Sequence, residues 1–230
     1  MSTFKGDKKV GSSILTTVEK RFVKKYISII PPQVETYHLT MCTIVWSLGM
    51  VYCGHLAKGN IAWIWGCTLM LCLQYLTDLF DGAIGRHRNT GLIKWGFYMD
   101  HFLDFIFSGA IVIAYALMSP PNLEIYFFAL LVCSGAFLVN SFLCFASTNE
   151  FEIYHYGLGP TEIRIGFAIM NLIICIFSTS IFKFWLPIIL TANVIALVVM
   201  VFSSHKKLWK IDMYKKRKSA WEKRRQENSQ

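Results

Sequence analysis

Residues 77–104 read TDLFDGAIGRHRNTGLIKWGFYMDHFLD and carry four aspartates in two pairs. Asp78 and Asp81 are three residues apart, and Asp100 and Asp104 are four residues apart. On a helix, either spacing puts both side chains of a pair on one face. The stretch therefore predicts two helix ends, each presenting a pair of carboxylates, joined by a tight basic loop.

The sequence around this stretch is apolar. Of the 230 residues, 54% are hydrophobic and 15% are aromatic, and the mean hydropathy is +0.44. A soluble domain of this length needs more charge to cover its surface, whereas several windows approach the ~20 apolar residues that cross a bilayer. We expect an all-α integral membrane protein with about six transmembrane helices. The windows are residues 39–57, 60–80, 98–118, 123–146, 164–181 and 184–204.

An amphipathic segment precedes these windows. Residues 12–30 carry apolar side chains at helical spacing with basic residues between them, which predicts a helix lying in the membrane interface. The two prolines that follow end this helix. Because no repeat or long linker divides the sequence, we expect one membrane domain over residues 1–230. Within it, residues 1–32 form a cytoplasmic amphipathic segment and residues 205–230 a basic cytoplasmic tail.

The positive charge is unevenly distributed along the chain. The formal net charge is +9, with 23 Lys and Arg residues. All but Lys58 and Lys183 fall in residues 1–30, residues 86–94, Arg164 or residues 205–230. By the positive-inside rule, both termini and the aspartate loop then face the cytoplasm, in a bacterial inner membrane or the endoplasmic reticulum. The basic tail is expected to meet anionic lipid headgroups, and no nucleic-acid partner is expected.

Cysteine usage and the N-terminus exclude two other classes. The seven cysteines have no paired spacing and lie mostly inside the apolar windows, so we expect buried free thiols and neither a disulfide framework nor a zinc site. The basic first 30 residues lack a compact apolar core, so no cleavable signal peptide is expected.

Four carboxylates at the level of a membrane are costly and usually mark a function. Divalent metal is the simplest compensation, because Mg²⁺ and Mn²⁺ favour oxygen ligands, and two ions held by facing carboxylate pairs can clamp a diphosphate. Gly82 and Gly96 leave room for a nucleotide or a neighbouring helix, and Arg86 can pair with phosphate oxygens. The alternative is a set of salt-bridged aspartates neutralised by Arg86, Arg88 and Lys94, with Arg86 as a positive-inside anchor.

The spacing of these residues forms a longer motif. It reads Asp78-x2-Asp81-Gly82-x2-Gly85-Arg86-x9-Gly96-x3-Asp100-x3-Asp104. This closely resembles the signature of the CDP-alcohol phosphotransferase family, D-x2-D-G-x2-A-R-x8/9-G-x3-D-x3-D. The departure is Gly85, where the family has alanine. Both residues are small, so close helix approach is preserved.

The resemblance implies an activity, a cofactor and a set of roles. Members move a phospho-alcohol group between a cytidine diphosphate carrier and a second alcohol, with release of CMP. It implies two Mg²⁺ or Mn²⁺ ions held by Asp78, Asp81 and Asp100, with Asp104 as a further ligand or a base. It also implies a CDP-linked donor near Asp78, Gly82, Gly85, Arg86 and Gly96, a lipid substrate and a homodimer.

Two details resemble the choline and ethanolamine phosphotransferase branch. His101 follows Asp100, and residues 159–162 read GPTE, ending in Glu162. In that branch the histidine and the glutamate are implicated in activating the hydroxyl of diacylglycerol. The branch has Gly-Cys where this chain has Phe102 and Leu103, so the match is partial.

The loop at residues 147–163 is a second place where charged groups gather. It holds His155 and Glu162, and Arg164 opens the window that follows. Arg164 and the basic loop also suit a different reaction, in which CDP-diacylglycerol donates a phosphatidyl group to a small anionic or polar alcohol such as inositol phosphate, glycerol phosphate or serine. A non-catalytic cation carrier is the alternative of another class, although a carrier has no need of the glycine and arginine spacing.

Overall fold

The described chain is helical apart from short turns. The structure is a computed structural model that describes residues 15–90, 92–148 and 160–227, and within those residues it contains no strand. The α-helices are α1 (Thr16–Tyr26), α2 (Thr36–Ala57), α3 (Ile64–Arg88), α4 (Ile93–Met118), α5 (Glu124–Thr148), α6 (Pro160–Phe177) and α7 (Phe182–Glu227). Three 3-10 helices, Ile27–Ile29, Ile61–Trp63 and Thr179–Ile181, adjoin them. The all-α prediction is confirmed.

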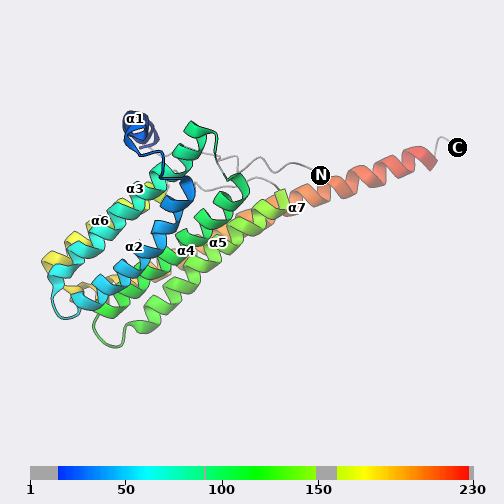
Figure 1. Ribbon diagram of the computed structural model, residues 1–230. Coiled ribbons are helices and arrows are strands. Elements are labelled where there is room, and N and C mark those ends of the chain that lie inside the picture. Colours follow the sequence, from blue (N-terminus) through cyan, green and yellow to red (C-terminus); the bar gives the residue numbers. More distant parts are fainter. Residues whose placement is uncertain (1–14, 91, 149–159, 228–230) are drawn as a thin grey trace.

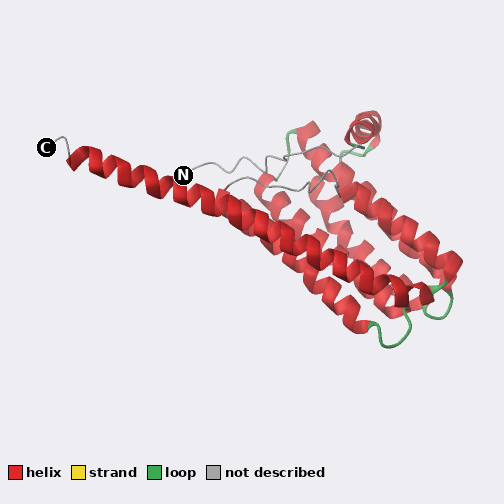
Figure 2. Ribbon diagram, turned by 180° about the vertical axis from the view of Figure 1, so that it is seen from behind, coloured by secondary structure: helices red, strands yellow, loops and turns green. Residues whose placement is uncertain are grey.

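Helices α2 to α7 run side by side in a bundle, and α1 lies across one end of it (Figure 1). That end also carries the turn between α3 and α4, and the rings of Phe22 in α1 and Phe80 in α3 are 5.9 Å apart. Seen from behind, α7 follows the bundle and then continues well beyond it (Figure 2). The amphipathic helix is thus a separate layer over the end that bears the aspartates.

Four of the described helical segments are long and apolar enough to cross a membrane: α2, α4, α5 and the segment Thr179–Glu227 that contains α7. Helices α3 and α6 run beside them in the same bundle, and α3 is the more polar because it carries Gln74, Asp78 and Asp81. The protein is therefore an integral membrane protein with several apolar helices. Six membrane crossings remain a prediction.

Several helix boundaries differ from the predicted windows, among them boundaries of α3, α6 and α7. Helix α3 ends at Arg88, eight residues past the predicted end at residue 80, so both of its aspartates lie within the helix. Helix α6 begins at Pro160, because proline suits the first turn of a helix. Helix α7 continues through the basic tail to Glu227, since residues 188–227 contain no glycine or proline to stop it.

The interfacial helix agrees with its prediction where the structure describes it. Helix α1 begins at Thr16, the 3-10 turn Ile27–Ile29 follows, and no residue of α1 is buried. The predicted residues 12–14 lie outside the described residues. The cysteines are all unpaired, and Cys72 is exposed, contrary to the expectation of burial, because it lies on the outer face of α3.

The core lies where α2, α3 and α4 meet. Met50, Ile64 and Ala114 are each 1% exposed or less. Helices α2 and α4 touch at Gly54, where an added Cβ would lie 2.6 Å from the Cα of Ala114. Only glycine permits that approach, so the sequence fixes α2 closely against α4.

Candidate active site

The two acid-bearing helix ends are joined by a short turn. Helix α3 ends at Arg88, and the next residue, Asn89, adopts the left-handed conformation with φ 55°, a conformation that asparagine tolerates better than most residues. The N–H of Thr90 then donates to the carbonyl of Gly85 at 3.1 Å. Because α4 begins only a few residues later, at Ile93, the acids of α3 and α4 come together at one end of the bundle.

Three of the four aspartates form a compact group. Asp78, Asp81 and Asp100 each offer one carboxylate oxygen, and these oxygens lie within 4.8 Å of one another. Asp81 is buried, with 8% of its surface exposed. Hard oxygen donors at this separation suit a divalent cation such as Mg²⁺ or Mn²⁺, so the donor set fits the cofactor implied by the sequence.

Asp104 lies beside this group but outside it. Its Oδ1 accepts a hydrogen bond from Nε2 of Gln74 at 3.3 Å, and Nη2 of Arg164 is 3.8 Å away. The structure therefore brings together three of the four predicted metal ligands, and gives the fourth an amide and a guanidinium as neighbours.

Arg164 supplies positive charge to the site from α6. Its Nη2 donates to Oδ2 of Asp78 at 2.8 Å, and its side chain is 15% exposed. The guanidinium also lies over the ring of Tyr75, 5.6 Å from the centroid. A charge-assisted bond in a largely buried setting is strong, so Arg164 compensates Asp78. The salt-bridge alternative considered from the sequence involves Arg86, Arg88 and Lys94 and does not include this residue.

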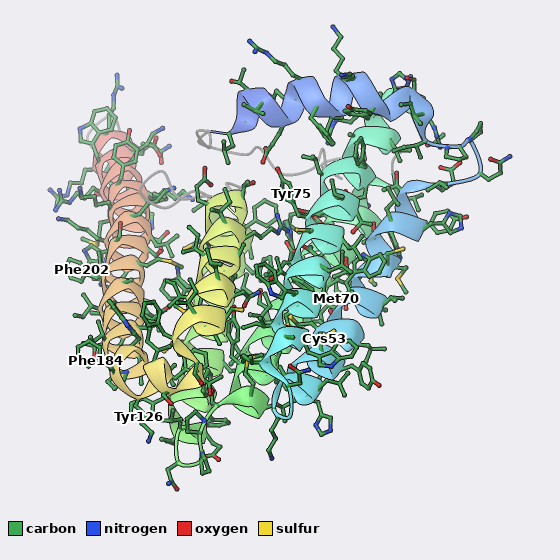
Figure 3. The ribbon with its side chains drawn as sticks, turned by 90° about the vertical axis from the view of Figure 1, so that its left-hand side faces the viewer. Cys53, Met70, Tyr75, Tyr126, Phe184 and Phe202 are labelled. Carbon is green, nitrogen blue, oxygen red and sulfur yellow. The ribbon has the colours of Figure 1, made fainter. Side chains whose placement is uncertain are left out.

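Helix α1 is tied to the same place through Glu19. Its Oε1 accepts a hydrogen bond from the hydroxyl of Tyr75 in α3 at 2.9 Å, and another from the hydroxyl of Thr161 in α6 at 2.6 Å. Figure 3 shows Tyr75 on α3, on the side of the bundle that α1 covers. The Tyr75 ring stacks on Arg164, and Thr161 lies about one turn before Arg164 in α6. Through its hydrogen bonds to Tyr75 and Thr161, Glu19 therefore holds two neighbours of the arginine in place.

Two basic residues near the end of α3, Arg86 and Arg88, have surroundings that differ from those of Arg164. The guanidinium of Arg88 donates to the carbonyls of Ile30 and Val34 at 3.0 and 2.7 Å, and also to those of Pro31 and Pro32. Arg88 thus holds the link between α1 and α2 and does not neutralise the aspartates. Arg86 is exposed, and its Nη1 lies 3.2 Å from where a Cβ on Gly82 would sit.

The remaining glycines of the motif differ in their surroundings. A Cβ on Gly96 would meet nothing within 4 Å, so there is open space beside α4 at that position. Gly85 is buried near the end of α3. Open space at Gly96 suits the predicted approach of a nucleotide.

His101 lies between the acids and an aromatic cluster. Its Nδ1 is 3.7 Å from Oδ2 of Asp100, and its side chain is 12% exposed. The ring packs edge-on against Phe97, with centroids 4.6 Å apart, and lies 5.7 Å from the ring of Phe142 in α5. The imidazole is therefore held at the rim of the acid group, on the side of α5.

Glu162 lies in the first turn of α6 and not in a loop, which corrects its predicted setting. A carboxylate in the first turn of a helix is favoured by the helix dipole. Arg164 follows within the same helix, half a turn later. His155, another residue of the predicted loop, lies outside the described residues.

Sequence reasoning missed the hydroxyl groups that α2 brings to the acids. Thr40 donates to a carboxylate oxygen of Asp81, and Thr36 donates to its main-chain carbonyl, each at 3.1 Å. The sequence contains a pattern that could have predicted these hydroxyl contacts. Thr36, Thr40, Thr43 and Ser47 recur at the spacing of one helix face, and in an otherwise apolar helix such a polar stripe indicates a buried polar contact.

An apolar cavity of about 300 Å³ lies between α4, α5, α6 and α7. Its walls include Val112, Leu130, Ile163, Gly166, Phe167 and Leu186. Ile163 precedes Arg164 in the chain, so the cavity reaches the same turn of α6 that faces the acids. An apolar space beside a charged site, within a membrane bundle, suits a hydrocarbon chain.

Comparison with known proteins gives one match. Residues 36–203 match the family model described as CDP-alcohol phosphatidyltransferase. Searches of curated proteins and of solved structures found no significant match. The matched segment begins with α2 and extends into α7, so it contains all four aspartates and Arg164.

Proposed function

The chain belongs to the CDP-alcohol phosphatidyltransferase family, and from this membership we propose a specific reaction. Members are transferases of phosphate-containing groups in phospholipid synthesis, with CDP-alcohol and lipid substrates. We propose that this protein transfers phosphocholine or phosphoethanolamine from a CDP-alcohol to the hydroxyl of a diacylglycerol-like lipid. The observation that carries the proposal is the group of three carboxylates with Arg164, which comes from a helix that also lines an apolar cavity.

The proposed reaction is an exchange at one phosphorus atom. The lipid hydroxyl oxygen forms a bond to the phosphorus that carries the amino alcohol. The bond from that phosphorus to the bridging oxygen breaks, and CMP leaves with the electron pair. The hydroxyl proton passes to a base on the protein. Phosphoryl transfer of this kind requires mainly positioning and neutralisation of charge.

We assign the acids to the cofactor and the motif glycines to the donor. Asp78, Asp81 and Asp100 would hold two Mg²⁺ or Mn²⁺ ions, with Asp104 as a further ligand or a base. Divalent metal, when bound, supplies positive charge that neutralises diphosphate oxygens. The family is typically dependent on such a metal. Gly82, Gly85, Gly96 and Arg86 would lie along the CDP group, with Arg86 donating to phosphate oxygens.

Two residues are proposed to activate the lipid hydroxyl. Imidazole has a pKa near ~6.5 when unperturbed, which suits a base at neutral pH. His101 sits at the rim of the acid group, and Glu162 lies in the turn of α6 that also carries Arg164. We propose His101 as the base and Glu162 as its orienting carboxylate in the substrate complex. His101→Ala should then lower turnover more than nucleotide affinity.

The cavity between α4 and α7 supports a lipid substrate. We propose that an acyl chain lies there, because the walls are apolar and end near Arg164. Gly166 lines this cavity, and a Cβ on Gly166 would meet nothing within 4 Å. Gly166→Leu should therefore fill the space without disturbing the core, and should shift preference toward lipids with shorter chains.

A second reaction is favoured by Arg164. A guanidinium at the acid group could bind an anionic acceptor, with CDP-diacylglycerol as the lipid donor and inositol phosphate, glycerol phosphate or serine as the acceptor. The cation-carrier alternative is disfavoured because the chain belongs to a transferase family.

Two features of the whole protein are proposed with this function. Both termini and the site would face the cytoplasm, which agrees with the placement of α1 and the α3–α4 turn at one end of the bundle (Figure 1). The protein would act as a homodimer. Gly109 and Gly135 are small residues that could allow close helix contacts, and an added Cβ on them would lie 3.6 Å from Leu131 and 3.7 Å from Phe105 within the chain.

The test is release of CMP by the purified protein in lipid, with Mg²⁺ or Mn²⁺ and with a chelator as control. One set of substrates is CDP-choline or CDP-ethanolamine with diacylglycerol, and the other is CDP-diacylglycerol with a panel of polar alcohols. Release with the first set supports the proposed reaction. Release with the second set alone supports the alternative and removes the role proposed for His101. Metal-independent release with either set would contradict the carboxylate assignment.

A further inference from the structure

Helix α2 reaches Asp81 with two hydroxyl groups. Oγ1 of Thr40 lies 3.1 Å from Oδ2 of Asp81 and donates to it, and Oγ1 of Thr36 donates to the carbonyl oxygen of Asp81 at 3.1 Å. Thr40 is 4% exposed and Thr36 is 8% exposed. Both contacts join residues more than 40 positions apart in the sequence, so they depend on how α2 packs against α3.

The two oxygens of the Asp81 carboxylate have different partners. Oδ2 accepts from Thr40, and Oδ1 accepts from the main-chain N–H of Gly82. With a donor on each oxygen, the plane of the carboxylate is fixed. Each carboxylate has about four lone-pair sites, so these two bonds still leave lone pairs directed at a cation.

The hydroxyl of Thr40 has a second acceptor within reach. Its Oγ1 is also 3.1 Å from the carbonyl of Thr36, one turn earlier in the same helix. A hydroxyl carries a single hydrogen, and a charged acceptor binds it more strongly than a neutral carbonyl. The carboxylate of Asp81 accepts a hydrogen bond from this hydroxyl, whereas a threonine facing lipid would donate to its own helix.

The element that carries Thr40 is itself rigidly placed. Helix α2 is in close contact with α4 at Gly54 and Ala114, and it shares the buried core with α3 and α4. A hydroxyl on such an element can hold a ligand in one orientation, because neither side of the hydrogen bond is free to move.

From these contacts we propose that Thr40 is a positioning residue for the metal site. Its hydroxyl holds the Asp81 carboxylate in the orientation in which it joins Asp78 and Asp100 around a divalent cation. The proposal rests on the proposed function, since it assumes that these acids bind metal. Removing an outer partner of a metal ligand typically lowers metal affinity by about 10–100-fold.

The test measures Mn²⁺ binding directly, without substrates. Purified protein in lipid is titrated with Mn²⁺, and free Mn²⁺ is followed by electron paramagnetic resonance. Thr40→Val keeps the shape of the side chain and removes the hydroxyl, so its dissociation constant should rise by about 10–100-fold. Thr40→Ser keeps the hydroxyl and should restore most of the affinity.

Thr43→Val is the matched control. Thr43 lies on the same buried face, nearly one turn farther along α2, and is 5% exposed. Thr43→Val removes a buried hydroxyl from the same helix, as Thr40→Val does, but at a position away from Asp81. It should therefore leave Mn²⁺ affinity within about twofold of the wild type. Thermal unfolding of all three variants checks that the bundle is intact.

The outcomes separate this inference from the proposed function. Equal Mn²⁺ affinity in Thr40→Val and wild type overturns the positioning role. An equal loss in Thr43→Val also overturns it, since the effect would then belong to α2 packing. If wild-type protein binds no Mn²⁺ while still releasing CMP, the metal assignment itself fails.

Discussion

The two halves of the bundle are packed to different degrees. In the apolar windows of α2 and α4, 33% and 39% of the residues are buried, whereas in those of α5 and α7 the figures are 6% and 11%. We call α2, α3 and α4 the acid half, and α5, α6 and α7 the lipid half. The acid half holds the carboxylates and most of the buried core, and the apolar cavity lies between the lipid half and α4.

This difference agrees with the ligands proposed for the two halves, a divalent cation and an acyl chain. Carboxylates that share a cation must keep their separations, so they are carried on closely packed helices. An acyl chain is flexible and makes non-directional contacts, so its surroundings can be looser. Arg164 is the exception, because it extends from the lipid half into the acid half.

The largest effect is expected at the acid group. Asp81→Asn keeps the size of the side chain and removes a negative charge, and it should lower CMP release by at least about 1,000-fold. Asp212→Asn, in the exposed part of α7, makes the same change far from the bundle and should have no effect. Turnover near the wild-type rate in Asp81→Asn would contradict the site.

Arg164→Gln should have the next largest effect. It removes the partner of Asp78 and leaves like charges facing one another, so turnover should fall by about 100-fold, equivalent to ~3 kcal/mol. Lys183→Gln, on the exposed surface at the start of α7, is the control for loss of one positive charge. If both variants behave alike, the arginine does not link the two halves.

Packing can be compared directly with two glycine-to-alanine changes. At Gly54 an added Cβ would lie 2.6 Å from the Cα of Ala114, so Gly54→Ala should cost about 1–3 kcal/mol of stability. At Gly166 an added Cβ would meet nothing within 4 Å, so Gly166→Ala should be neutral or stabilise by up to ~1 kcal/mol. Thermal unfolding in the same lipid measures both. A similar change of stability in both variants would contradict the proposed difference in packing between the two halves.

The smallest effect is expected at α1. Glu19→Ala removes the acceptor of the Tyr75 and Thr161 hydroxyls, and should loosen α1 and lower turnover by about fivefold, or ~1 kcal/mol. Hydrogen exchange in α1 should rise in parallel. The control is Glu222→Ala in the α7 tail, where the carboxylate lies 3.9 Å from an exposed lysine, Lys218. Unchanged exchange in Glu19→Ala would show that α1 is held by other contacts.

Much of the acid half could be predicted because its signals are local. The three- and four-residue spacings of the aspartates indicate which helix face each carboxylate occupies, and Asn89 and Thr90 lie in the short turn that brings the faces together. The family resemblance came from the same short stretch, and the match over residues 36–203 confirms the family. It does not distinguish between the branches.

The partners of the acids could not be predicted in the same way. Thr40 and Arg164 are 41 and 60 positions from Asp81 and Asp104, the acids they approach, and only the packing of α2 and α6 brings them there. Arg88 shows that closeness in the sequence can also mislead. It lies close to the acids in sequence, but its guanidinium points to the carbonyls before α2.

The position of Arg164 late in the chain also orders events during synthesis. Helices α2, α3 and α4 leave the ribosome before α6 is made, because chains are produced from the N-terminus. The hydroxyl of Thr40 is therefore available to Asp81 as soon as α2 and α3 have been made. The negative charge of Asp78 is not compensated by Arg164 until α6 has been made. A nascent chain that has not reached residue 164 carries all four aspartates without their arginine. The acid half can be inserted early, but its charges are balanced only when the lipid half is nearly complete.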